Sequence, residues 1–127
     1  MNNPIKILIA DDHAVVRSGI RSLLEDEAHI HIVGEAADGF EALEKIEKLR
    51  PDILLLDLAM PQMSGFEVAQ AVSAKHNWVK IIVFSMHNDH EYIMRSVEMG
   101  ARGYLLKDTS KEEILRALTV VANGSKY

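Results

Sequence analysis

The sequence predicts an α/β domain with a five-stranded parallel sheet and helices on both of its faces. Five short apolar runs alternate with five longer segments whose apolar residues recur at helical spacing. One run, 52–57 (DILLLD), holds only isoleucine and leucine between its aspartates, which is typical of a strand buried on both faces. Because regular alternation of strand and helix favours parallel pairing, these observations predict a (βα)5 arrangement.

The first half of the chain predicts two strand–helix units. Segment 5–10 (IKILIA) is rich in isoleucine and stops at acidic residues, as a short buried strand does. A helix follows, and its apolar residues are Val16, Ile20, Leu23 and Leu24. Segment 30–37 is rich in β-branched residues, and Gly34 within it indicates a bulge or a close packing contact. Residues 38–41 (DGFE) have the form of a capping box that opens the second helix, which Pro51 ends.

The second half of the chain predicts three more units. Further capping-box patterns predict helix starts at Ser64, Asn88 and Ser110. The first of these helices should run to about His76 and the second to near Gly100, a residue type suited to a helix C-terminus. The strands are predicted at 52–57, 79–85 and 102–106. The last helix has an apolar stripe made of Ile114, Leu115, Leu118, Val121 and Ala122.

The composition is that of one soluble domain and excludes several kinds of function. A chain of 127 residues can form one domain with a continuous core. The net charge of −5 argues against direct nucleic-acid binding by this segment. The absence of cysteine excludes thiol catalysis, cysteine-ligated metals and disulfides. With no signal-peptide or transmembrane pattern, we expect a cytoplasmic protein that makes no membrane contact.

Polar side chains stand at the carboxyl ends of four predicted strands. They are Asp11 and Asp12 after the first strand, Asp57 at the third, Ser85 at the fourth and Lys107 after the fifth. Ligands of open parallel sheets bind outside the carboxyl ends of the strands, near the point where the strand order reverses. We therefore expect the functional site at this edge.

Three carboxylates at one edge require something to offset their repulsion. Two unit charges about 4 Å apart interact by roughly 4 kcal/mol at an effective dielectric constant near 20. Protonation, a cation or dispersal into water relieves this repulsion. Mg²⁺ prefers oxygen ligands and takes one or two carboxylates together with phosphate oxygens, so Mg²⁺ is the predicted cation. Zinc is disfavoured because the sequence has no cysteine and no close histidine pair at these loops.

The lysine and the third-strand aspartate indicate phosphoryl chemistry. Together with Mg²⁺, Lys107 could neutralise the oxygens of a transferring phosphoryl group. A carboxylate can accept such a group as an aspartyl phosphate. Asp57 is the best candidate because it ends the most buried strand.

Several motifs, in this order and spacing, resemble the receiver domain of two-component response regulators. They are Asp11-Asp12, the segment 57–65 (DLAMPQMSG), Ser85 and the segment 104–107 (YLLK). Similarity to the NarL/FixJ branch in particular is found in the segments 11–13, 16–20, 85–87 and 103–108. The resemblance covers essentially the whole chain and implies a flavodoxin-like fold with strand order 2-1-3-4-5.

The resemblance also implies a role for each residue of the site. Asp57 would accept a phosphoryl group from a sensor histidine kinase or a phosphotransfer protein. Asp12 and Asp57 would hold Mg²⁺ together with the backbone carbonyl of Ala59, while Asp11 would act largely through water. Lys107 would contact the phosphoryl group.

By the same resemblance, Ser85 and Tyr104 are a switch pair that reads the phosphoryl group. Taken alone, Ser85 would be a strand-end cap and Tyr104 a half-buried strand aromatic. As a pair they would alter the surface made by the fourth helix, fifth strand and fifth helix. We expect this change to favour homodimerisation.

The domain organisation expected from the resemblance is a receiver at residues 1–124. Residues 125–127 would start a linker to a helix-turn-helix domain outside this chain, through which alone DNA would be bound. The receiver would be a phosphoacceptor switch that assists its own phosphorylation and dephosphorylation, and not an enzyme. A stand-alone receiver acting through protein–protein contacts is the alternative.

Two other functions on this fold fit the residues less well. A Mg²⁺-dependent phosphatase with an aspartyl nucleophile needs a second aspartate two residues after the first-strand aspartate, but His13 stands there. Nucleotide or flavin binding lacks a glycine-rich phosphate motif. For His13 itself we expect a loop or N-cap role and not metal binding.

The sequence departs from the receiver pattern at two places. Asp108 follows Lys107 where much of the family has proline, so a cis peptide bond is not expected there. Met86 follows Ser85 where many receivers have a small residue, and its side chain would narrow access to Asp57.

Overall fold

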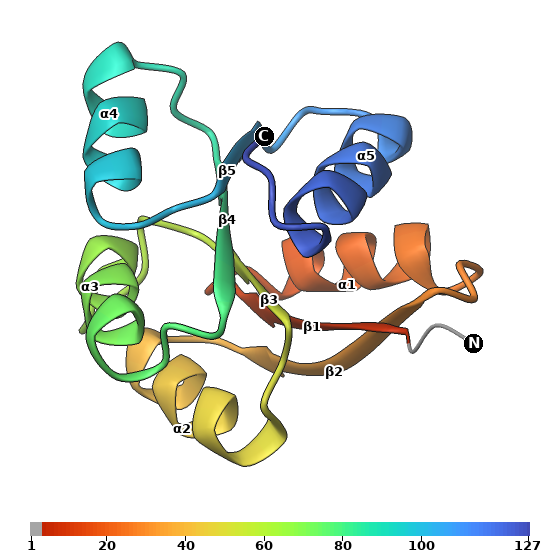
Figure 1. Cartoon of the computed structure of the whole chain (residues 1–127), viewed down its shortest axis with the longest axis horizontal. Helices are drawn as coiled ribbons and strands as arrows, with labels where there is room; N and C mark the ends of the chain where they lie inside the picture. Colours follow the sequence, from red (N-terminus) through yellow and green to blue (C-terminus); the bar gives the residue numbers. More distant parts are fainter. Residues whose placement is uncertain (1–3) are drawn as a thin grey trace.

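One parallel sheet organises residues 4–127, the part of the chain that the computed structural model describes (Figure 1). Its strand order is β2-β1-β3-β4-β5, which confirms the predicted fold class and strand order. All four strand pairings are parallel. The strands are β1 (Ile5–Ala10), β2 (Ile30–Ala36), β3 (Ile53–Leu56), β4 (Lys80–Ser85) and β5 (Gly103–Leu106).

Helices cover both faces of the sheet. α1 and α5 lie on one face, and α2, α3 and α4 lie on the other (Figure 1). Within residues 4–127, no helix is long and apolar enough to cross a membrane. The helices are α1 (Ala14–Leu24), α2 (Gly39–Leu49), α3 (Gly65–Lys75), α4 (His90–Glu98) and α5 (Lys111–Ala122).

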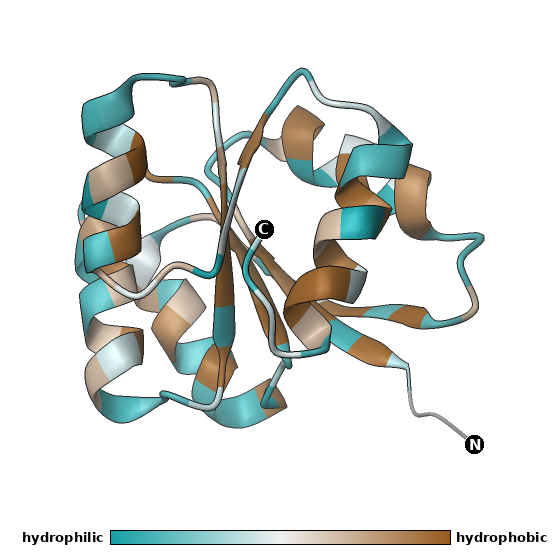
Figure 2. Ribbon diagram, turned by 45° about the horizontal axis from the view of Figure 1, so that its top comes forward, coloured by the Kyte–Doolittle hydropathy of each residue, from teal (hydrophilic) through white to brown (hydrophobic). Residues whose placement is uncertain are grey.

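The β3 strand explains why a continuous apolar run lies at the centre of the sheet. Leu54 and Leu56 pack into the core beneath α2, α3 and α4, whereas Ile53 and Leu55 pack beneath α1 and α5. Successive side chains of a strand point to opposite faces, so both faces of β3 need apolar residues. Figure 2 shows hydrophobic residues gathered along the central strands.

Side-chain caps begin three of the helices at the predicted residues. Ser64 and Glu67 make the full reciprocal capping box at the start of α3. Asp38 and Ser110 make only one of the two capping-box bonds. The side chain of each accepts a hydrogen bond from the backbone N–H three residues further on. These bonds satisfy N–H groups that would otherwise lack partners in the first helical turn.

The predicted start of α4 at Asn88 is wrong. The N-cap residue is Asp89, whose side chain makes no capping bond, and the helix begins at His90. The cause lies in the preceding loop, where the backbone N–H and carbonyl of His87 are both hydrogen-bonded. The N-cap therefore lies one residue later than the Asn88 pattern predicts.

Predicted bounds of four strands are too long by one residue at one or both ends. The flanking residues still make backbone hydrogen bonds to the neighbouring strand: Asp57 N–H donates to the Ala10 carbonyl, and Arg102 N–H to the Ile81 carbonyl. They lie outside the strands nevertheless, because the regular pairing of the strands stops short of them. Apolar content therefore located the strands but not their terminal residues.

The expectation for Gly34 is confirmed. The pairing of β1 with β2 shifts register between Ile7, opposite Ile32, and Leu8, opposite Gly34. A Cβ atom on Gly34 would lie 2.9 Å from Leu49 Cδ1, so this bulge also brings the strand close to α2.

Two helix ends are as predicted. α2 ends at Leu49, and Arg50 takes a left-handed conformation with φ of 51° directly before Pro51. Gly100 follows α4 with φ of 97°, a conformation in which glycine carries no side-chain penalty.

The segment after α5 returns to the sheet. Tyr127 N–H donates to the Arg102 carbonyl at 2.8 Å, directly before β5. The Tyr127 hydroxyl donates to the Glu113 carboxylate on α5. The chain thus reaches residue 127 beside the amino end of the β5 edge strand.

Candidate functional site

The carboxyl edge of the sheet brings together the polar residues predicted there. Asp57 follows β3, and its N–H donates to the Ala10 carbonyl, so it stands beside the acidic residues that follow β1. Lys107 follows β5, and its N–H donates to the Ser85 carbonyl at the end of β4. Parallel pairing in register is therefore what gathers these side chains.

One buried ammonium group lies between two buried carboxylates. Lys107 Nζ is 2.8 Å from Asp11 Oδ2 and 3.4 Å from Asp57 Oδ2. The two carboxylate side chains are 2% and 5% exposed, and that of Lys107 is 9% exposed. Apart from these ion pairs, neither Oδ2 atom has a hydrogen-bond partner within residues 4–127. One positive charge thus faces two negative charges in a place that water reaches poorly.

Burial and charge shift the pKa values of this cluster. Burial raises the pKa of Asp57, and the Asp11 charge adds to the rise, while the Ala59 N–H and Lys107 oppose it. Burial lowers the pKa of Lys107, but the two carboxylates outweigh burial and leave that pKa raised. Lys107 therefore stays protonated at neutral pH, and its single charge compensates the two neighbouring carboxylates only in part.

Every polar atom of Asp11 has a neighbour that fixes it. Its N–H donates to the Ala36 carbonyl at 3.0 Å, and its carbonyl accepts from Arg17 Nη1 at 2.5 Å. Its Oδ1 accepts from His13 N–H at 2.9 Å, and its Oδ2 faces Lys107. The polar atoms of Asp11 thus already have partners in the protein, which leaves Asp12 as the freer of the two neighbouring carboxylates.

A divalent cation fits the remaining oxygen atoms. One ligand atom each from Asp11, Asp12, His13 and Asp57 lies within 4.8 Å of the others. Asp12 is partly exposed, and Asp57 Oδ2 is a buried oxygen that lacks a hydrogen bond and lies farther from Lys107 Nζ than Asp11 Oδ2 does. Two such carboxylates are the donor set that Mg²⁺ prefers. Ala59 lies in the same loop, where its N–H donates to Asp57 Oδ1 at 3.2 Å.

His13 takes the N-cap position of α1, as predicted, without a side-chain capping bond. Its Nδ1 lies 3.1 Å from both Asp11 Oδ1 and Asp12 Oδ1. The ring therefore stands against the acidic pair from the solvent side, since 63% of its side chain is exposed.

Both predicted switch residues bind the same loop residue. Ser85 is buried, and its Oγ accepts from His87 N–H at 3.1 Å. The Tyr104 hydroxyl donates to the His87 carbonyl at 2.6 Å. The His87 ring in turn stacks on Tyr92 of α4, with centroids 4.3 Å apart and planes 6° apart. Burial raises the pKa of Tyr104, which the nearby Ser85 hydroxyl partly offsets.

Sequence reasoning missed the role of His87, although the segment 85–87 is one of those that resemble the NarL/FixJ branch. The contacts of His87 come from backbone atoms and ring stacking, which its residue type alone does not predict. The expected trans bond between Lys107 and Asp108 agrees with the absence of cis peptide bonds across residues 4–127. Met86 is 74% exposed beside the site, and its effect on access to Asp57 stays a prediction.

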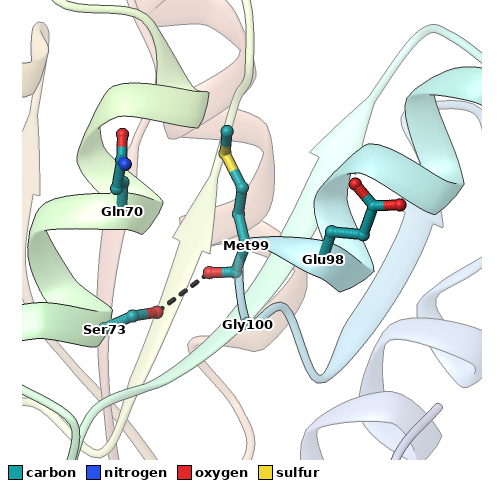
Figure 3. Close-up of a pocket in the computed structure, with 5 residues that line it drawn as sticks. All are labelled: Gln70, Ser73, Glu98, Met99 and Gly100. Carbon is teal, nitrogen blue, oxygen red and sulfur yellow. Dashed lines mark hydrogen bonds between the residues drawn. The ribbon is translucent and has the colours of Figure 1, made fainter.

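A pocket of about 450 Å³ lies away from these residues, between the ends of α3 and α4 (Figure 3). Ser73 Oγ donates to the Met99 carbonyl at 2.9 Å across it. A Cβ atom on Gly100 would lie 2.5 Å from Ser73 Oγ, so the two helix ends meet closely. The pocket lies at the opposite edge of the sheet from the acidic cluster and contains no residue predicted for the site.

The comparison with protein families agrees with the geometry of the site. Residues 7–119 match the family model described as the response regulator receiver domain. The chain belongs to this family. Receiver domains generally bind Mg²⁺ at an acidic pocket, and those of transcriptional regulators are generally not enzymes. Receivers of NarL-type regulators interact with histidine kinases.

Curated relatives of this receiver are transcriptional regulators. It is 41% identical over 120 residues to the transcriptional regulatory protein YdfI of Bacillus subtilis, covering 94% of this chain and 56% of the relative. It is also 41% identical over 121 residues to the nitrate/nitrite response regulator NarL of Escherichia coli, covering 95% and 56%. The receiver therefore spans about half the length of these relatives and has NarL-type sequence character.

Solved structures show the same fold. The signal receiver domain of a NarL response regulator from Mycobacterium tuberculosis matches with a TM-score of 0.92 and 35% identity, covering 97% of this chain and 99% of that one. The isolated receiver domain of RcsB from Salmonella enterica, solved with the phosphomimetic BeF₃⁻, matches with a TM-score of 0.90 and 28% identity. That match covers 98% of this chain and 93% of the other.

Proposed function

We propose that this receiver accepts a phosphoryl group on Asp57 from a phosphohistidine of a sensor kinase or phosphotransfer protein. The observation that carries the proposal is the setting of Asp57 Oδ2. This oxygen is buried, lacks a hydrogen bond within residues 4–127, and has the Lys107 ammonium 3.4 Å away. A nucleophile and a positive charge for the incoming group are therefore side by side.

Each site residue has a separate role in the proposed phosphoryl transfer. An oxygen of the ionised Asp57 carboxylate attacks phosphorus, and a P–O bond forms as the P–N bond to the donor imidazole breaks. The donor nitrogen keeps the electron pair. The protonated Lys107 stabilises the negative charge on the phosphoryl oxygens. Bound Mg²⁺ would add to this neutralisation.

Asp12 and Asp57 are the proposed Mg²⁺ ligands, together with the carbonyl of Ala59. Asp11 would act largely through water, because its four polar atoms already have neighbours.

We expect Asp12→Ala to weaken Mg²⁺ binding more than Asp11→Ala, in a calorimetric titration of the unphosphorylated protein. If both variants bind Mg²⁺ as wild type does, the proposed metal site is wrong.

The wider role proposed for the chain is the input half of a transcription regulator. Residues 1–124 would be the receiver, and residues 125–127 the start of a linker to a helix-turn-helix domain. Phosphorylation would favour homodimerisation in the cytoplasm, and DNA would be bound only through the linked domain. The length of the curated relatives supports this division.

Intact-mass measurement after incubation with acetyl phosphate and Mg²⁺ tests the acceptor. Wild type should gain one phosphoryl group, about 80 Da, on an aspartate. Asp57→Asn should gain none. The matched control is Asp52→Asn, which removes the same residue type at the other end of β3 and should label normally. Labelling of Asp57→Asn at the wild-type level would show that another residue is the acceptor.

A further inference from the structure

A charged network behind the acidic loop reaches the backbone of Asp11. Arg17 on α1 donates from Nε to Glu35 Oε1 at 3.0 Å and from Nη1 to the Asp11 carbonyl at 2.5 Å. Its side chain is only 17% exposed. One guanidinium group thus joins the β2 strand to the loop that follows β1.

Glu35 is held from several sides. Arg21, one turn further along α1, donates from Nε to the other carboxylate oxygen of Glu35 at 2.7 Å. Lys45 of α2 donates to the Glu35 backbone carbonyl. Burial raises the pKa of Glu35, but the two arginines outweigh it and hold that pKa below its usual value. Glu35 therefore stays ionised and keeps Arg17 in one orientation.

We infer that Arg17 is a positioning residue for the Mg²⁺-binding loop, an inference that rests on the proposed function. The Asp11 carbonyl and the Asp12 N–H belong to the same rigid peptide plane. By holding that carbonyl, Arg17 sets the direction from which the Asp12 side chain leaves the backbone. The side-chain hydrogen bonds of Arg17 go to Glu35 and to the Asp11 backbone, so its effect on the site would pass through that backbone.

The chemistry of the network favours arginine at this position. The planar guanidinium presents donors in a fixed fork, so Arg17 can bind the Glu35 carboxylate and the Asp11 carbonyl at once. Lysine has a single compact ammonium and cannot reproduce the fork. Glu35 also offsets the positive charge of Arg17, which would otherwise oppose a cation at the neighbouring loop.

Arg21 provides a matched comparison within the same network. It binds the same carboxylate and carries the same charge, but its hydrogen bond goes to Glu35 and not to Asp11. A general effect of charge or of Glu35 anchoring would appear in variants of both arginines. An effect on the loop would appear in variants of Arg17 alone.

The test measures Mg²⁺ affinity by calorimetry and melting temperature for Arg17→Gln, Arg17→Lys and Arg21→Gln. Loss of groups that orient a metal ligand weakens metal binding by about 10- to 100-fold. We expect a loss of about tenfold in both Arg17 variants and less than about twofold in Arg21→Gln. At saturating Mg²⁺, the Arg17 variants should still gain the phosphoryl group to the wild-type extent.

Different outcomes separate this inference from the proposed function. Equal Mg²⁺ affinity in Arg17→Gln and Arg21→Gln, with wild type binding Mg²⁺ and labelling normally, would overturn the positioning role alone. If Arg17→Gln does not fold, Arg17→Lys decides, because it keeps the charge and the aliphatic stem. Wild type that neither binds Mg²⁺ nor labels would overturn the proposed function itself.

Discussion

Asp57 lies in surroundings that suit its proposed role as phosphoacceptor but lower the folding stability. A carboxylate whose pKa is raised in the folded protein is less favourably ionised there than in the unfolded chain. The resulting loss of folding stability is fully present at pH values above the pKa of Asp57 in the folded protein. It disappears as the pH falls through that pKa. Lys107 does not remove the cost, because it is shared with Asp11.

Asp57→Asn should therefore stabilise the protein at pH 7. We expect a gain on the order of 1 kcal/mol, equivalent to roughly 4 °C in Tm for a domain of this size. The gain should shrink as the pH is lowered towards 4, because the wild-type carboxyl becomes protonated. Thermal unfolding at several pH values measures both effects. A gain that grows on acidification would contradict the sign of the argument.

The sequence could predict the residues at the strand ends and not those that support them. Asp57 and Lys107 follow apolar runs, so the topology of a parallel sheet brings them together. Arg17 and Glu35 are 18 positions apart and meet because β2 carries a bulge and α1 crosses beside it. Such a contact depends on register and side-chain reach, which no residue pattern specifies.

Among the elements, the start of α3 comes very close to the loop that follows β3 and contains Asp57. Gly65 is the first residue of the helix, and its N–H donates to the Leu58 carbonyl at 2.9 Å. A Cβ atom there would lie 2.4 Å from the Asp57 carbonyl oxygen and 2.5 Å from Leu58 Cα. Only glycine lets the helix and the loop meet at this distance.

Gly65→Ala should destabilise the domain by about 1–3 kcal/mol, since backbone atoms must move apart to admit the methyl group. It should also slow the labelling of Asp57, whose own carbonyl is one of the displaced atoms. Gly19→Ala is the control, because Gly19 lies in α1 with open space around its Cβ position. That change should be neutral or stabilising by up to about 1 kcal/mol. Urea unfolding measures the free energy of unfolding of both variants. Equal changes in Gly65→Ala and Gly19→Ala would refute the close approach of α3 to the loop that contains Asp57.

The helix caps show how far local sequence predicts element boundaries. At Ser64 the pattern and the structure agree because the box residues bond to each other. At Asn88 the same kind of pattern failed, since the hydrogen bonds of His87 shift the entry into α4 by one residue. Local patterns predict boundaries where the bonds are local, and distant contacts decide elsewhere.

On the scale of the whole molecule, Ser85 and Tyr104 connect the site to α4 through His87. The Ser85 oxygen accepts a hydrogen bond from His87, which leaves its O–H proton available for a phosphoryl oxygen on Asp57. A hydrogen bond to a charged acceptor is worth about 1.5–3 kcal/mol, comparable to typical allosteric coupling of about 1–3 kcal/mol. One such bond would be sufficient to bias the proposed partner surface, which includes α4.

Ser85→Ala should still accept phosphate at Asp57 but lose most of the phosphorylation-dependent gain in self-association. The association constant for dimerisation should be about tenfold lower than that of phosphorylated wild type. This difference corresponds to roughly 1.4 kcal/mol. Sedimentation of phosphorylated and unphosphorylated forms provides the measurement, with Ser73→Ala at the far edge of the sheet as control. If Ser85→Ala shifts as much as wild type, its hydroxyl does not relay the signal.

Both ends of the described chain lie at the amino edge of the sheet. The chain enters β1 at Ile5, and Tyr127 returns to Arg102 just before β5. A strand of four residues, the length of β5, spans about 13 Å, so the whole height of the sheet separates these ends from the acidic cluster. A segment joined after Tyr127 therefore begins at the edge of the sheet opposite Asp57, and it must run along the domain surface for about this distance before it can contact the acidic cluster.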